Sequence, residues 1–263
     1  MRPDWTQALG KHSRGSRPRC IALVDGTREL VSASLTELIE LPDTVVNPAD
    51  FWMPSGKPVA RPSGWDDTLV REARLDHVAR LLPATIRLVL KDWWLAVARG
   101  ANTPNWDLAS TCTIRGRQGL LLVEAKAHGN ELSAAGKSLP TSANGWKNHE
   151  QIAMAIAGAN SALKHATSGD WSLSRDDSYQ LSNRFAWAWK IVSLGVPVVL
   201  LYLGFLRAEE MAGNGTPFRT HHDWDNALRD HATGVVDATC WNTPIELGDV
   251  PLYPLIRSLE VTL

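Results

Sequence analysis

Three residues that could together hold a divalent cation lie within one short stretch, residues 105–128. Asp107 comes near its beginning, and Glu124 and Lys126 come near its end. Mg²⁺ prefers hard oxygen ligands, commonly one or two carboxylates completed by water and by phosphate oxygens of a substrate. An ammonium group beside the ion can position an attacking water and neutralise charge that develops on a phosphate. These residue types therefore indicate metal-assisted chemistry on a phosphate ester.

A β-hairpin would bring these side chains together. Two extended runs, residues 110–114 and 120–123, flank a polar turn that contains two glycines. Because side chains alternate between the faces of a strand, Glu124 and the lysine two residues later share one face, while Ala125 points into the packing. The turn then brings Asp107 opposite this end of the second run. The simpler alternative is a solvated Glu-x-Lys pair on an exposed strand, which would have no chemical role.

The arrangement resembles the PD-(D/E)xK, or restriction-endonuclease-like, nuclease superfamily. The pattern of that group is an Asp near one strand followed by Glu-x-Lys on the next, and it matches Asp107 and Glu124-Ala125-Lys126. The match is incomplete, because Asn105-Trp106 precedes the acid here in place of a proline, although Pro104 lies close by. The resemblance implies that Asp107, Glu124 and the Ala125 carbonyl bind Mg²⁺, that Mn²⁺ can substitute, and that Lys126 positions the water.

A second pair of polar residues follows on a predicted helix over residues 179–193. Gln180 and Arg184 are four residues apart and therefore share a helix face. Several lineages of the superfamily place a Gln or a basic residue on the helix after the Glu-x-Lys strand, so the resemblance adds Gln180 to the catalytic group and Arg184 to the groups around it. An ordinary surface helix also carries such a pair, and both interpretations stay open.

Other polar residues near the motif are candidates for supporting or substrate-contacting groups. The superfamily often adds an acid from a helix before the hairpin, and of Glu72 and Asp92 we favour Glu72. His128 and Glu131 follow the motif directly. Each of these side chains could equally be solvated.

The remaining motifs do not support another chemistry. Gly136-Lys137-Ser138 lacks the glycine spacing of a phosphate-binding loop, so we expect it in the rim of the site. His221, His222 and Asp225 lack the spacing of a zinc centre. There is no nucleophile-elbow pattern, and no cysteine has a catalytic context.

The predicted fold class is α/β, with a restriction-endonuclease-like core in which helices flank a central mixed β-sheet. Helices are predicted from Asp66 or Asp67 to Leu82, over residues 84–99, over residues 148–164 and over residues 179–193. An apolar strand, residues 197–203, follows the last helix. Strand hairpin, helix and apolar strand is the order of elements in the superfamily core.

We expect a single nuclease-like domain, residues 1–263, divided into four parts. These are a mobile basic tail (1–19), an accessory segment (20–65) with a small hairpin over residues 20–31, a core (66–210) and a C-terminal extension (211–263). The extension ends in a predicted closing strand, residues 256–263.

Composition narrows the class of protein. The chain has 263 residues, 44% of them hydrophobic and 21% charged, and a formal net charge of −1. This charge gives no sign of strong non-specific binding to nucleic acid, although a local basic face is compatible with it. The three cysteines are far apart, which favours a reducing compartment, and we expect a cytoplasmic protein. No apolar run reaches the ~20 residues that cross a membrane, so no membrane partner is expected.

From these observations we expect a Mg²⁺-dependent phosphodiester hydrolase, a nuclease that favours DNA over RNA. A homodimer is left open. The alternatives are a catalytically inactive nuclease-fold binding module in a larger complex, and an α/β protein in which Glu124 and Lys126 have no shared role.

Overall fold

The computed structural model describes residues 4–62 and 64–263, and a mixed seven-stranded β-sheet lies at its centre. The strands of this sheet are β1 (Thr44–Val45), β2 (Trp52–Met53), β7 (Leu108–Ile114), β8 (Arg117–Lys126), β9 (Val198–Leu206), β10 (Ile245–Leu247) and β11 (Val250–Glu260). Two short ribbons lie outside it: β3 (Val59–Arg61) with β4 (Gly64–Asp66), and β5 (Ala73–Arg74) with β6 (Asn105–Trp106).

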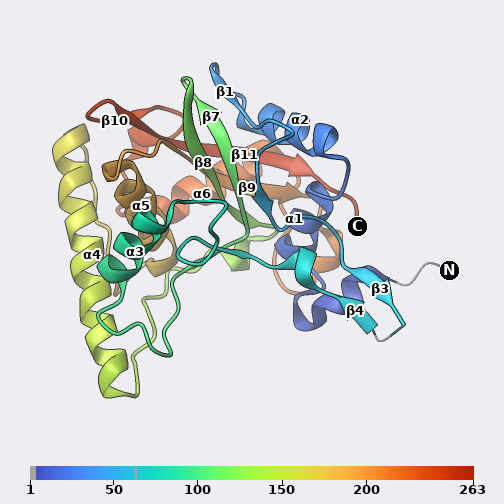
Figure 1. The fold of residues 1–263 in the computed structure, drawn as a ribbon, viewed down its shortest axis with the longest axis horizontal. Coiled ribbons are helices and arrows are strands. Elements are labelled where there is room, and N and C mark those ends of the chain that lie inside the picture. Colours follow the sequence, from blue (N-terminus) through green and yellow to red (C-terminus); the bar gives the residue numbers. More distant parts are fainter. Residues whose placement is uncertain (1–3, 63) are drawn as a thin grey trace.

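The sheet order is β1–β7–β8–β9–β11–β10, and β2 also pairs with β7. β7 and β8 are antiparallel, whereas β8, β9 and β11 run parallel to one another. Two parallel strands need a crossover that covers a face of the sheet. Helices supply it here, which confirms the expected α/β architecture with a central mixed sheet and flanking helices (Figure 1).

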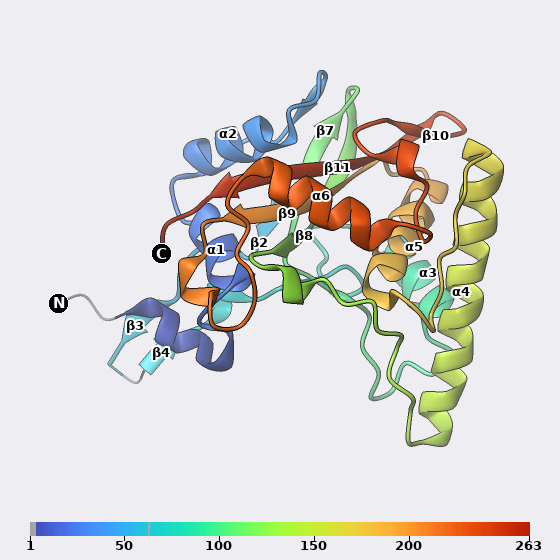
Figure 2. The ribbon, with the colours of Figure 1, turned by 180° about the vertical axis from the view of Figure 1, so that it is seen from behind.

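Helices cover both faces of the sheet. The α-helices are α1 (Ser16–Leu23), α2 (Arg28–Ile39), α3 (Ala84–Trp94), α4 (Ala143–Thr167), α5 (Tyr179–Ser193) and α6 (His221–Ala232). Short 3₁₀ helices are η1 (Trp5–His12), η2 (Thr68–Val70), η3 (Gly129–Glu131), η4 (Glu209–Met211) and η5 (Ala238–Cys240). Both ribbon views place α3, α4 and α5 together on one side and α1 and α2 on the opposite side (Figures 1 and 2).

The alternation of side chains along β8 divides the core into two layers. Leu120 and Leu122 pack in the layer that contains residues of α3 to α6, whereas Leu121 and Val123 pack in the layer beneath α1 and α2. Ala125 belongs to the second layer, as the hairpin prediction requires. The side chains on either side of it therefore face α5.

The predicted hairpin is confirmed, but its turn is shorter than the polar turn predicted over residues 115–119. Ile114 pairs with Arg117, so the turn contains only Arg115 and Gly116, both with positive φ (48° and 74°). Such a two-residue turn matches the twist of antiparallel strands and favours glycine. The register continues to Leu108 opposite Val123, which brings the residue before Leu108 next to the residue after Val123.

The N-terminal part differs from the prediction. The predicted hairpin over residues 20–31 is wrong, because these residues belong to α1 and α2. Asp25-Gly26 does reverse the chain, but between two helices, and Thr27 caps α2. Residues 1–19 were expected to form a mobile tail. From Trp5 on they form η1 and the start of α1, and Arg19 is buried.

The helix predicted from Asp66 or Asp67 to Leu82 is also wrong. This segment contains η2 and β5, and β5 pairs with β6. Tertiary pairing overrides a helical pattern here. The other three predicted helices are confirmed, although α3 ends at Trp94 rather than at residue 99 and α4 begins five residues before residue 148.

The C-terminal residues belong to the central sheet. β11 pairs with β9 from Leu252 to Glu260, so this strand is part of the core rather than of an extension, and it begins six residues before the predicted closing strand. No helix among residues 4–62 and 64–263 combines the length and the apolar character that a membrane span requires.

Candidate active site

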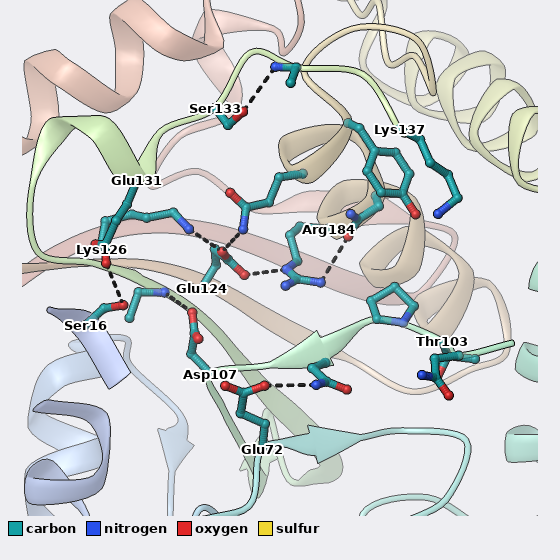
Figure 3. Close-up of a pocket in the computed structure, with 18 of the residues that line it drawn as sticks. Ser16, Glu72, Thr103, Asp107, Glu124, Lys126, Glu131, Ser133, Lys137 and Arg184 are labelled. Carbon is teal, nitrogen blue, oxygen red and sulfur yellow. Dashed lines mark hydrogen bonds and ion pairs between the residues drawn. The ribbon is translucent and has the colours of Figure 1, made fainter. Parts of the chain in front are cut away.

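A cavity of about 800 Å³ opens where β8 ends and α5 begins. Its wall comes from the segment around β6, the end of β8, the polar loop after β8 and the first turns of α5 (Figure 3). The predicted site residues that line it are Asp107, Glu124, Ala125, Lys126, Gln180, Arg184, Glu72 and Glu131. His128 does not line this cavity. The fold therefore brings the hairpin motif and the α5 pair to one opening, although they are more than 50 residues apart in the chain.

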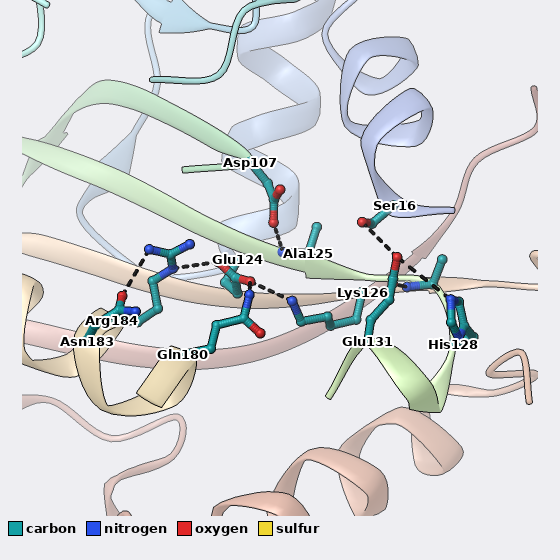
Figure 4. Close-up of polar contacts among 11 residues, drawn as sticks. Ser16, Asp107, Glu124, Ala125, Lys126, His128, Glu131, Gln180, Asn183 and Arg184 are labelled. Carbon is teal, nitrogen blue, oxygen red and sulfur yellow. Dashed lines mark hydrogen bonds and ion pairs between the residues drawn. The ribbon is translucent and has the colours of Figure 1, made fainter. Parts of the chain in front are cut away.

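Glu124 is the most heavily hydrogen-bonded of these groups. It is 1% exposed. Its Oε1 accepts hydrogen bonds from Lys126 Nζ at 2.6 Å and from Gln180 Nε2 at 2.7 Å, and its Oε2 accepts one from Arg184 Nε at 2.5 Å (Figure 4). Gln180 and Arg184 can both reach it because residues four apart on a helix share a face. Two cations and one amide thus hold a single buried carboxylate.

This network fixes the charges of its members. Burial raises the pKa of Glu124, but the positive charges of Arg184 and Lys126 outweigh this effect, so its pKa lies below the usual value. Burial lowers the pKa of Lys126, and Glu124 and Asp107 raise it further than burial lowers it. Arg184 behaves in the same way. At neutral pH the carboxylate is therefore ionised and Lys126 is protonated, which suits an amine that orients water rather than one that removes its proton.

Asp107 lies beside Glu124 in a different environment. Its Oδ2 accepts a hydrogen bond from the Ala125 backbone N–H at 2.8 Å, which fixes the carboxylate next to the end of β8. No side-chain cation donates to it within residues 4–62 and 64–263. Partial burial and the negative charge of Glu124 raise the pKa of Asp107 to about 7, although Lys126 opposes this rise.

The donor set fits a hard divalent cation. Asp107 and Glu124 offer carboxylate oxygens at one end of the cavity, and the Ala125 backbone carbonyl is close by in sequence. Mg²⁺ commonly takes one or two protein carboxylates and fills its remaining positions with water and phosphate. The structure forms no group of three or more His, Cys, Asp or Glu side chains suited to a metal within its described residues. A site here would therefore depend on two carboxylates and one backbone oxygen.

Glu72 and Glu131 line the same cavity, but each has partners of its own. Glu72 lies in the segment before β5 rather than on a helix, and it accepts hydrogen bonds from Asn105 Nδ2 at 2.9 Å and from Arg17 at 3.0 Å. Glu131 accepts hydrogen bonds from the Ala127 backbone N–H and from Ser16 Oγ. Both acids tie segments of the wall together.

His128 is buried, and its Nε2 lies 3.9 Å from a carboxylate oxygen of Glu131. The ring is outside the cavity, and its nearest acidic group there is Glu131. Trp106 directly precedes Asp107 in the chain. It is fully buried, and the Arg184 guanidinium lies 4.5 Å from the centre of its ring. Trp106 therefore supports the cation that holds Glu124.

The sequence did not indicate Ser16 and Tyr179, which line the cavity, or Arg17, which donates a hydrogen bond to Glu72 in its wall. Ser16 and Arg17 lie in the segment predicted to be a tail, and no local pattern connects them with residues 72 and 131. For Lys137 the sequence predicts only a position in the rim of the site. In the structure it lies on the side of the cavity away from Lys126, and its ammonium is 4.9 Å from the centre of the Tyr179 ring (Figure 3).

Comparisons with protein-family models, with curated proteins and with solved structures found no match to this chain.

Proposed function

We propose that this protein is a metal-dependent phosphodiester hydrolase that acts on nucleic acid, with DNA favoured over RNA. The observation that carries the proposal is the convergence of Asp107, Glu124 and Lys126 at one end of an open cavity of about 800 Å³. Three such groups meeting without a shared purpose would be costly, because charged side chains lose favourable hydration when they leave water.

The order of elements gives the proposal independent support. An antiparallel hairpin, β7 and β8, is followed by α4, by α5 and then by β9, which pairs in parallel with β8. This order resembles the core of the PD-(D/E)xK nucleases, in which the Glu-x-Lys strand lies inside a mixed sheet. The site residues come from the ends of these elements, where loops and strand termini commonly carry function.

The chain's residues have separate roles in this hypothesis. A Mg²⁺ ion held by Asp107, Glu124 and the Ala125 carbonyl would act as a Lewis acid on the phosphate and would lower the pKa of water. Lys126 orients the attacking water and stabilises negative charge on the phosphate. Gln180 and Arg184 keep Glu124 ionised and fixed in position.

Cleavage assays with purified protein test this proposal. We expect hydrolysis of single- or double-stranded DNA with Mg²⁺ or Mn²⁺ and none with EDTA. Lys126→Ala should lower the rate by roughly 10²–10³-fold, the range for loss of one transition-state donor. Lys164→Ala, at an exposed position of α4 outside the cavity, is the matched control and should keep full activity. Undiminished cleavage by a folded Lys126→Ala variant would remove this lysine from the mechanism.

One observation favours a second function, a catalytically inactive module that binds a partner within a larger complex. Both oxygens of Glu124 are already engaged by Lys126, Gln180 and Arg184, so this carboxylate is stable without an ion. Calorimetric titration with Mg²⁺ or Mn²⁺ separates the two functions. A nuclease should bind the ion and lose binding in Asp107→Asn, whereas an inactive module needs no ion.

A further inference from the structure

A second cavity, of about 370 Å³, adjoins the candidate active site. Asn102 and Lys137 line both cavities and mark the boundary between them. The lining of the second cavity combines apolar and polar residues. Its apolar lining is Leu95, Ala101, Pro140 and Ile152, and its polar lining includes Ser138, Asn148 and His149. An apolar space with a few polar groups is the usual form of a small-molecule site.

His149 carries an unpaired polar atom beside this cavity. Its side chain is 2% exposed, and its Nδ1 has no hydrogen-bond partner within the part of the chain that the structure describes. Buried polar atoms are nearly always paired, so this unpaired atom, in a residue that lines the cavity, is a candidate partner for a bound molecule. The neighbouring Asn148 differs, because its amide group bonds both to the N–H and to the C=O of Val97.

Lys137 lines both cavities. Its backbone N–H is fixed by a hydrogen bond to Arg175 O at 2.8 Å, and its side chain lies over the Tyr179 ring. Among residues 4–62 and 64–263 no carboxylate lies within ion-pair distance of its ammonium. A cation held in this way between two cavities suits the phosphate of a strand that extends from one to the other.

We propose that the second cavity binds one unpaired nucleobase of the substrate strand, next to the phosphodiester that the first cavity would cleave. This inference rests on the proposed function, and it names the substrate class. The base would lie against the apolar wall formed by Leu95, Ala101 and Ile152 and would pair its hydrogen-bonding edge with His149. Lys137 would bind the phosphate between this base and the site of cleavage.

The size of the second cavity limits the form of nucleic acid. A base that is stacked and paired in a duplex cannot enter it, because enzymes that bind a base in a pocket act on single strands or draw the nucleotide out of the stack. The preferred substrates are therefore single-stranded DNA or frayed ends. Sequence preference should be weak, because a single edge contact and apolar packing accept several bases.

Equilibrium binding in EDTA tests the pocket without cleavage. Unlabelled tetrathymidylate and four versions that each lack one base compete with a labelled strand in fluorescence anisotropy. Base packing against a protein ring or apolar wall commonly accounts for about a tenfold change in affinity. We expect one of the four abasic strands to bind about tenfold more weakly than the intact strand, and the other three to bind nearly as well as it does.

A variant that fills the pocket completes the test. Ala101→Phe adds bulk at a partly exposed position of the cavity, and Ala157→Phe adds it at an exposed position of α4. Ala101→Phe should weaken binding of the intact strand about tenfold. It should also abolish the difference in affinity between the intact strand and the sensitive abasic strand. Ala157→Phe should change neither affinity. The proposal of a base pocket would be overturned if Ala101→Phe weakened binding of the intact and abasic strands equally. It would also be overturned if the wild type bound all four abasic strands as well as the intact strand.

The hydrogen bond has a separate test. His149→Asn keeps a polar atom near the position of Nδ1, and His149→Leu removes it. We expect the leucine variant to lose several-fold in affinity for the intact strand alone and the asparagine variant to recover most of it. Base-dependent binding without metal-dependent cleavage would support the pocket and refute the nuclease. Cleavage without base-dependent binding would refute the pocket and leave the nuclease intact.

Discussion

Asp107 and Glu124 are neighbouring carboxylates on paired segments of one hairpin, and their surroundings are opposite. Glu124 is almost completely buried and accepts hydrogen bonds from Lys126, Gln180 and Arg184. Asp107 is partly buried and has one backbone N–H as its partner. The pKa of the first is lowered and that of the second is raised to about 7.

In the proposed function, the two similar acids have different tasks. The protein itself compensates the charge of Glu124, so this residue can order Lys126 and the start of α5 before any ligand arrives. Asp107 lacks such compensation, and a cation from solution would supply it. A site built in this way is pre-organised on one side and open to an ion on the other.

Arg184→Met should have the largest effect on stability, because it leaves Glu124 buried with one cation fewer. Breaking a buried ion pair by removing one partner typically costs about 3–5 kcal/mol. Urea denaturation at pH 7 measures the change in the free energy of unfolding. Arg229→Met is the matched control: Arg229 forms a partly exposed ion pair with Asp225 at 2.8 Å, and its loss should cost less than about 1 kcal/mol. Similar costs for both variants would mean that Glu124 does not depend on Arg184.

Asp107→Asn should instead raise the free energy of unfolding, and the size of this increase should depend on pH. In the unfolded chain this carboxyl has its ordinary pKa of 3.8, and in the folded protein about 7. The folded state therefore holds the proton more tightly, and ionisation of Asp107 costs stability as pH rises from about 4 to about 7. Without divalent metal we expect the free energy of unfolding of the variant to exceed that of the wild type by roughly 2–3 kcal/mol at pH 8. The difference is no larger because water partly screens the carboxylate.

At pH 4 the two proteins should be equally stable, since Asp107 is protonated in the folded wild type there. Denaturation curves at pH 4 and pH 8, with and without Mg²⁺, test this expectation. Mg²⁺ should stabilise the wild type at pH 8 and leave Asp107→Asn unchanged. A pH-independent difference between the two proteins would show that Asp107 does not carry the uncompensated charge.

Some parts of the molecule could be predicted from the sequence and others could not. The hairpin and α5 follow from local signals: alternation along β8, a glycine in a positive-φ turn and the four-residue spacing of Gln180 and Arg184. That both α5 residues contact Glu124 depends on the packing of α5 against the sheet, which local signals do not encode.

The N-terminal contributions to the cavity were not predictable from local patterns. Ser16 and Arg17 reach Glu131 and Glu72 because α1 packs against β8, a contact between segments about 100 residues apart. Likewise, the local pattern of residues 66–82 predicts a helix, whereas in the structure β5 lies within this segment and pairs with the distant β6. Propensity is a weak guide where the partner is distant.

Gln180→Met should have the smallest effect on stability, because it removes only one of the three hydrogen-bond donors to Glu124. Hydrogen bonds to charged groups contribute about 1.5–3 kcal/mol, and bonds between neutral groups contribute about 1. Lys126 still donates to the same oxygen, so we expect a loss near the lower end, roughly 1–2 kcal/mol. Gln151→Met is the control, because Gln151 Nε2 donates to the neutral Trp93 carbonyl at 2.9 Å from an equally half-buried position.

The two glutamines differ in the charge of the group that they hold, so the comparison isolates that charge. Lowering the pH through the pKa of Glu124, which lies below its usual value, should shrink the cost of Gln180→Met, because Glu124 then takes up a proton and its hydrogen bonds lose their charge. The cost of Gln151→Met should stay constant over the same range. If both costs stayed constant, Gln180 would contribute only packing, and Glu124 would be held by Arg184 and Lys126 alone.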